Sequence, residues 1–193
     1  MVYLRSFIPW IALTLLTGVV DVGWAATIAL ALAAGLIVGR RRAGSAWGAL
    51  AIECSALVFL AGYTAVAFTA PDSATVAHYG GPASSLWLAV TAWASLALRR
   101  PFTLGIARAQ VPEQHWNSPL FRHVNRVITA VWALAFTASG AGSALLHHYR
   151  PEADTARTLL TVAAFALPAL FTARYPDLAR ARHTATPREK AAR

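Results

Sequence analysis

Six long apolar runs, separated by short polar stretches, constrain this chain more than any other feature of its sequence. A helix that crosses a bilayer needs about 20 mostly apolar residues, with a range of about 17–25. The chain is 57% hydrophobic and 13% charged, which is about half the charge of an average soluble domain. We therefore predict an all-α, polytopic membrane bundle. Its six spans are expected at residues 7–20, 22–38, 46–68, 83–98, 127–146 and 158–173.

The first run is the shortest and leaves three interpretations open. It reaches span length only if Tyr3, Leu4 and Arg5 join it, with the Arg5 side chain extending to the membrane surface. A re-entrant hairpin and a cleaved signal peptide are the alternatives. We favour an uncleaved hairpin, because no small-x-small cleavage pattern precedes Asp21 and a second apolar run follows at once. Asp21 is then expected to cap the second helix.

The basic residues predict how the bundle is oriented. When the loops are assigned to alternating sides, 15 of the 17 Lys and Arg residues fall on one side, and only Arg150 and Arg157 fall on the other. Cytoplasmic loops carry such an excess. We expect both termini in the cytoplasm and anionic lipid headgroups beside the basic loops.

The same pattern divides the chain into a transmembrane domain over residues 1–180 and a basic, disordered cytoplasmic tail over 181–193. The longest polar stretch, a cytoplasmic segment over 99–126, lies between the fourth and fifth spans. Within it, residues 102–111 are expected to form a short amphipathic helix on the membrane face, ended by Pro112.

Glu53 is the one acidic residue well inside a predicted span, about two turns from its cytoplasmic end. A carboxylate in hydrocarbon is costly, so it should face the bundle and find a partner or be protonated. The neighbouring cations at the same membrane face are Arg99, Arg100 and Arg126. The alternatives are a structural ion pair or helix N-terminus interaction and a proton or ligand site.

No catalytic, metal or cofactor site is predicted. The lone Cys54 excludes an internal disulfide and a cysteine metal cage. A membrane haem needs axial ligands inside two helices, whereas His147 and His148 lie at the end of one span and His78 lies in a loop. Nucleic acid is also excluded as a partner, because the basic residues are clustered between long apolar runs.

Small residues predict close helix packing. Gly35 and Gly39 form a GxxxG pattern in the second span, Gly44 and Gly48 repeat it before the third, and residues 139–144 read Ser-Gly-Ala-Gly-Ser-Ala. Two interpretations stay open: packing within the bundle, and contact with another protein or a second copy of the chain.

An ordered series of short motifs resembles a known family. It begins with Phe7-Ile8-Pro9, continues through Asp21 with Ala25-Ala26 and through Arg99-Arg100-Pro101-Phe102, and ends with Trp116, Pro119-Leu120-Phe121 and Asn125. Its order and spacing over about three-quarters of the chain are similar to those of the bacterial intracellular septation protein A (YciB) family. Ile128 stands where that family has Trp, so the chain resembles a divergent branch.

The resemblance implies a non-enzymatic role in envelope integrity or septation, through contacts with envelope or division proteins and without a cofactor. It draws attention to Asp21, Trp116 and Asn125, and to the Arg99-Arg100-Pro101 turn, as structural or interaction residues. Asn125 is expected to cap the fifth helix and Pro101 to end the fourth. The alternative functions are a small transporter or channel that uses Glu53 and a lipid-modifying membrane enzyme.

Overall fold

The computed structural model describes the backbone of residues 5–191 and the side chains of residues 5–181. This part of the chain is helical throughout and contains no strand, which confirms the all-α prediction. The helices, with two 3₁₀ turns labelled η, are α2 (Ile8–Leu16), α3 (Val22–Arg42), η1 (Trp47–Ala49), α4 (Ala51–Thr69), α5 (Ala74–Ala97), α6 (Phe102–Arg108), η2 (Glu113–His115), α7 (Pro119–Tyr149) and α8 (Asp154–Ala191).

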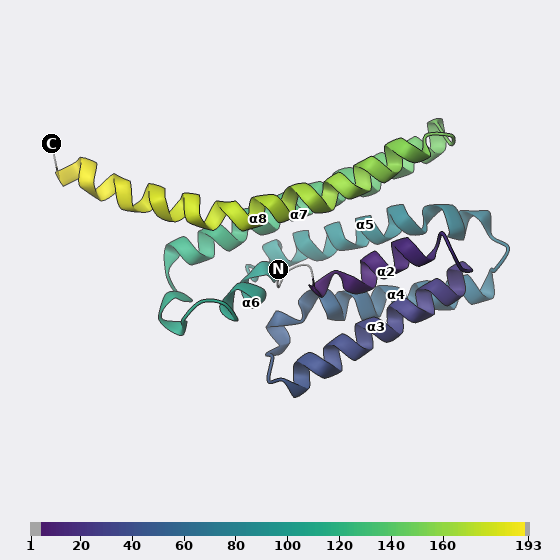
Figure 1. Cartoon of the computed structure of the whole chain (residues 1–193), viewed down its shortest axis with the longest axis horizontal. Helices are drawn as coiled ribbons and strands as arrows, with labels where there is room; N and C mark the ends of the chain where they lie inside the picture. Colours follow the sequence, from purple (N-terminus) through teal and green to yellow (C-terminus); the bar gives the residue numbers. More distant parts are fainter. Residues whose placement is uncertain (1–4, 192–193) are drawn as a thin grey trace.

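The long helices lie along one common direction, and each runs back past the one before it (Figure 1). The turns that follow α2, α4 and α7 gather at one end of the bundle, which we call the far end. The turns that follow α3 and α5 gather at the opposite end, together with α6 and η2. We call this the basic end, because Arg40, Arg41 and Arg42 and the arginines of residues 99–126 lie there.

Four helices are long and apolar enough to cross a membrane: α3, α4, α7 and the Asp154–Ala181 part of α8. The other two predicted spans differ from expectation. The helix in the first run, α2, has only nine residues. The helix in the fourth run, α5, begins nine residues before the predicted span, because it includes the polar stretch from Ala74 through Pro82.

Packing is closest between α5 and α7, between α3 and α4, and between α7 and α8. Helix α3 packs through a row of small residues, of which Ala25, Ala29 and Ala33 are fully buried. An aromatic cluster then joins the start of the chain to the last two helices. In it, Phe7 stacks on Trp132 with ring centroids 4.9 Å apart and meets Phe165 edge-on at 5.6 Å.

The segment between α5 and α7 folds back against the bundle. Helix α6 ends at Arg108, before the predicted end at Pro112, and it buries Phe102, Thr103 and Ile106. Gly105 lets it approach η1 closely, since a Cβ there would lie 2.0 Å from the carbonyl oxygen of Gly48. Thus one side of α6 packs on protein, and its position on the membrane face stays a prediction.

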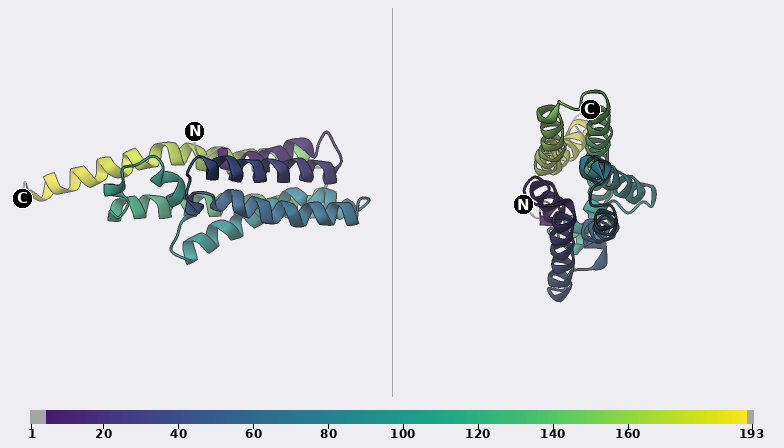
Figure 2. Two further views of the ribbon diagram at one scale, coloured as in Figure 1. Left: turned by 90° about the horizontal axis from the view of Figure 1, so that it is seen from below. Right: turned by 90° about the vertical axis from the view of Figure 1, so that its right-hand side faces the viewer.

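The last helix continues well past the bundle (Figure 2, left). Its 38 residues would extend about 57 Å at 1.5 Å per residue, against a hydrocarbon core of about 30 Å. The backbone is helical up to Ala191, through most of the segment for which the sequence predicted a disordered tail over 181–193. Residues 192–193 of that tail lie outside the described residues.

Candidate functional site: the buried carboxylate and the basic end

Glu53 is buried, with 1% of its surface exposed. It lies in the first turn of α4, because residues 46–50 form an extended residue and a 3₁₀ turn instead of the first turns of the helix. Glu53 is therefore nearer the start of its helix than the two turns expected from the apolar run. At this position the free backbone N–H groups of the helix N-terminus favour a negative charge.

Two side chains hold the Glu53 carboxylate. Arg40, in the last turn of α3, forms an ion pair and hydrogen bond with Oε1. The hydroxyl of Ser6, which is fully buried before α2, donates to the same oxygen at 2.9 Å. Nη1 of Arg40 also donates to Ser6 Oγ at 3.3 Å. The three residues, here called the Glu53 cluster, therefore join the N-terminal segment, α3 and α4 at the basic end.

The partner of Glu53 differs from the candidates taken from the sequence. Arg99, Arg100 and Arg126 are all exposed, and Arg40 forms the ion pair. From the sequence, Arg40 was expected only to orient the bundle, as one of the cations in a basic loop. Its position offered a clue, because a cation at the end of one helix and an acid at the start of the next come together across a short turn.

Asp21 and Pro101 occupy helix boundaries. Asp21 is the N-cap residue of α3, as predicted, but its side chain accepts no capping hydrogen bond from the described residues. Pro101 is the N-cap residue of α6, while α5 already ends at Ala97. Arg99, between the two helices, has a φ of 56°, a left-handed conformation that helps to reverse the chain.

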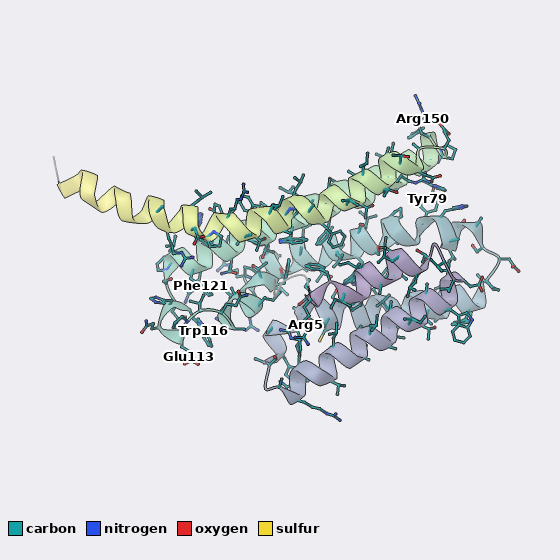
Figure 3. All side chains as sticks on the ribbon, in the orientation of Figure 1. Arg5, Tyr79, Glu113, Trp116, Phe121 and Arg150 are labelled. Atoms are coloured by element: carbon teal, nitrogen blue, oxygen red, sulfur yellow. The ribbon has the colours of Figure 1, made fainter. Side chains whose placement is uncertain are left out.

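Trp116 fixes the turn between α6 and α7. Its indole N–H donates to the carbonyl oxygen of Val111 at 2.8 Å, and the guanidinium of Arg108 lies 5.3 Å from the centre of its ring. Figure 3 shows Trp116 beside Glu113 and on the same side of the bundle as Phe121, whereas Tyr79 and Arg150 lie at the far end.

Asn125 does not cap the fifth span. The cap of α7 is Ser118, whose hydroxyl accepts the N–H of Phe121 at 3.2 Å, because the helix begins six residues before Asn125. Asn125 is 2% exposed and donates through Nδ2 to the carbonyl oxygen of Phe121 at 2.9 Å. Its Oδ1 is buried and has no hydrogen-bond partner among the described residues.

Asn125 also lines a cavity of about 750 Å³ that the sequence did not predict. The α7–α8 cavity lies between the first part of α7, the second part of α8 and the α6–η2 segment, and its wall is mostly apolar. It depends on how α8 is placed against α7, which no local pattern specifies. Glu53 does not line it.

The histidines at the far end come partly together. The rings of His78 and His147 lie 4.8 Å apart, and Tyr79 meets His147 edge-on at 4.9 Å. Within the described residues, no group of three or more His, Cys, Asp or Glu side chains is placed to hold a metal ion.

No family model, no curated protein and no solved structure matches this chain. The resemblance to the intracellular septation protein A family therefore stays a prediction.

Proposed function

We propose that this protein is a non-enzymatic component of a bacterial inner membrane that contributes to envelope integrity or septation by binding other membrane proteins through its helices. The observation that carries the proposal is an exposed face of α3 made of Trp24, Ile28, Leu32, Gly35 and Gly39. These positions are three or four residues apart, so they lie on one side of the helix.

The space around its glycines distinguishes this face from the contacts inside the bundle. Gly105 meets Gly48, and Gly140 lies against Leu86 of α5. In contrast, a Cβ on Gly35 or Gly39 would meet no atom of the described residues within 4 Å. Because small residues let membrane helices approach closely where lipid removes the hydrophobic driving force, this open GxxxG surface supports association with a helix from outside the bundle.

The Glu53 cluster gives little support to the transport alternative. A carboxylate that carries protons or ions needs access to a water-filled path. The Oε1 atom of Glu53 instead accepts from Arg40 and Ser6, its Oε2 atom is buried without a partner among the described residues, and Glu53 does not line the α7–α8 cavity. This arrangement fits a structural ion pair between helix ends.

The proposed placement has six crossings, with both termini in the cytoplasm. The alternating course of the helices supports it (Figure 1). So does the Ser6–Arg40 contact, which ties the start of the first run to the end of α3. We propose that the basic end faces the cytoplasm, because it holds the cations that the positive-inside rule assigns there.

In-cell photocrosslinking tests the proposal. A photoreactive residue at Leu32, on the exposed face, is expected to give discrete adducts with membrane proteins, and Gly35→Leu with Gly39→Leu should abolish them by blocking close approach. The control is Gly62→Leu on α4, where a Cβ also meets no atom within 4 Å; it should leave the adducts intact.

Two tagged forms of the chain, expressed together, would separate a homo-oligomer from a complex with another envelope protein. The absence of adducts at Leu32, or adducts that survive the Gly35→Leu/Gly39→Leu change in a folded protein, would contradict the proposed contact. Loss of the adducts should be accompanied by the envelope or division defect of a deletion strain.

A further inference from the structure

The α7–α8 cavity has a gradient of polarity along its length. Ile128 on α7 and Ala169 on α8 line its deep part, and the Trp132–Thr172 hydrogen bond of 3.0 Å adjoins it there. Toward the basic end its wall becomes polar, with Gln110, His115 and the Asp177–Arg180 pair. Because α7 and α8 run in opposite directions, the start of α7 lies beside the later part of α8. Both helices therefore contribute apolar residues to the deep part of the cavity and polar residues near the basic end.

The size and lining fit a bound amphiphile. Ligand cavities measure about 300–1,000 Å³ and combine a mainly apolar wall with a few polar groups. The cavity of about 750 Å³ falls within this range. Asn125 also lines it, and its buried Oδ1 has no hydrogen-bond partner in the described part of the chain. Because this oxygen can only accept, it would pair with a hydroxyl of the ligand and not with its phosphate.

The charge around the basic end indicates the headgroup, and Arg180, which pairs with Asp177, is the cation in the cavity lining itself. The segment over 99–126 holds five arginines and a single acid, Glu113. Arg174 and Arg180 add two cations on α8 against Asp177. This excess complements a phosphate, and anionic lipids are concentrated in the cytoplasmic leaflet, which is the leaflet beside the basic end in the proposed placement.

We propose that the α7–α8 cavity binds one anionic phospholipid, with an acyl chain along Val124, Ile128 and Ala169 and the phosphate at the mouth near His115 and Arg180. The inference goes beyond the proposed function and rests only on its membrane placement. The bound lipid would fill the space between α7 and α8 and hold the α6–η2 segment against them.

Native mass spectrometry of the full chain in detergent tests this. Phosphatidylglycerol and phosphatidylcholine with identical acyl chains serve as probes. We expect one phosphatidylglycerol to be retained per chain, with an affinity about tenfold higher than that of phosphatidylcholine, which corresponds to about 1.4 kcal/mol. Equal retention of the two lipids would overturn the proposal.

A matched pair of variants locates the site. Ala173→Phe places a ring in the cavity wall, whereas Ala166→Phe changes an exposed alanine on the same helix that does not line the cavity. The first should lower phosphatidylglycerol retention about tenfold and the second should not. Equal effects would mean that the lipid binds elsewhere, and would overturn the site.

Photocrosslinking of the unaltered protein covers the case in which Ala173→Phe does not fold. Phosphatidylglycerol with a photoreactive group in its acyl chain should label peptides that contain Leu120–Ile128 or Ala169–Ala173, and labelling confined to other helices would contradict the proposal. The α3 face does not line this cavity, so the two proposals can fail separately. If no lipid is retained, the Leu32 crosslinks should still form. If no Leu32 crosslinks form, the lipid should still be retained.

Discussion

Glu53 shows how a costly residue can be accommodated in an apolar bundle. The cost of burying a carboxylate falls when a cation and hydrogen-bond donors surround it. Here the two charges also lie at favourable helix ends, with Glu53 in the first turn of α4 and Arg40 in the last turn of α3. The ion pair, the hydroxyl of Ser6 and the two helix ends therefore together offset part of the cost of burying these side chains.

Removing one member of this cluster should destabilise the protein much more than removing the pair. We expect Glu53→Leu to lower the free energy of unfolding by about 3–5 kcal/mol, since it leaves the Arg40 charge largely buried and unpaired. Glu53→Leu with Arg40→Leu should recover most of that loss. Unfolding in mixed detergent–SDS micelles measures both.

The control is Asp177→Asn, which breaks the Arg180–Asp177 pair, whose side chains are 67% and 76% exposed. An exposed pair contributes about 0–1 kcal/mol, so this variant should unfold nearly as the unaltered protein does. A double variant less stable than Glu53→Leu would mean that Arg40 has another essential role.

At the same scale, the sequence could predict the burial of Glu53 but not its partner. A lone acid among apolar residues must be buried and satisfied whatever the tertiary structure. Which cation reaches it depends on the helix start at Ala51, and the apolar run continues without interruption from Ala46, so periodicity does not reveal that boundary. Asn125 was misassigned for a similar reason, because Ser118 and Pro119 begin the helix earlier.

Among the elements, α6 shows how a short segment is positioned by one close contact. Its seven residues are too few to be stable as an isolated helix, so its position depends on packing. Gly105 meets the backbone of Gly48, and Thr103 donates to the carbonyl oxygen of Asn125 at 3.0 Å. The Arg99-Arg100-Pro101 turn was predictable from its proline, whereas the burial of α6 against η1 and α7 was not.

Substituting Gly105 should reverse the usual effect of alanine in a helix. Alanine normally stabilises a helix relative to glycine by about 1 kcal/mol. At Gly105, however, the new Cβ would lie 2.0 Å from a backbone oxygen, and such overpacking typically costs about 1–3 kcal/mol. We therefore expect Gly105→Ala to lower the thermal unfolding temperature in detergent.

Gly35→Ala provides the comparison, since it has the same chemical change on α3 in open space. It should leave the unfolding temperature unchanged or slightly raised. If both variants behaved alike, the close contact between α6 and η1 would be refuted.

For the whole molecule, the path of the chain gathers at one end segments that the charge pattern assigns to one side. The sequence predicted two sides from 15 cations against two. The helices alternate in direction (Figure 1), and Tyr79 of α5 and Arg150 after α7 both lie at the far end (Figure 3). The packing of α5 on α7 and of α3 on α4 could not be predicted, because apolar helices in lipid have no single face that must be buried.

The orientation leads to a labelling pattern for single cysteines in a Cys54→Ala background. An impermeant thiol reagent applied to intact cells should label Asp72→Cys and Glu152→Cys, which lie in the turns at the far end. It should label Ala43→Cys and Ala109→Cys, both exposed at the basic end, only after the inner membrane is permeabilised.

Gly18→Cys, after the nine-residue α2, tests the first run and should behave like Asp72→Cys. External labelling at Ala43→Cys would reverse the orientation, whereas a protected Gly18→Cys beside a labelled Asp72→Cys would show that the first run does not cross.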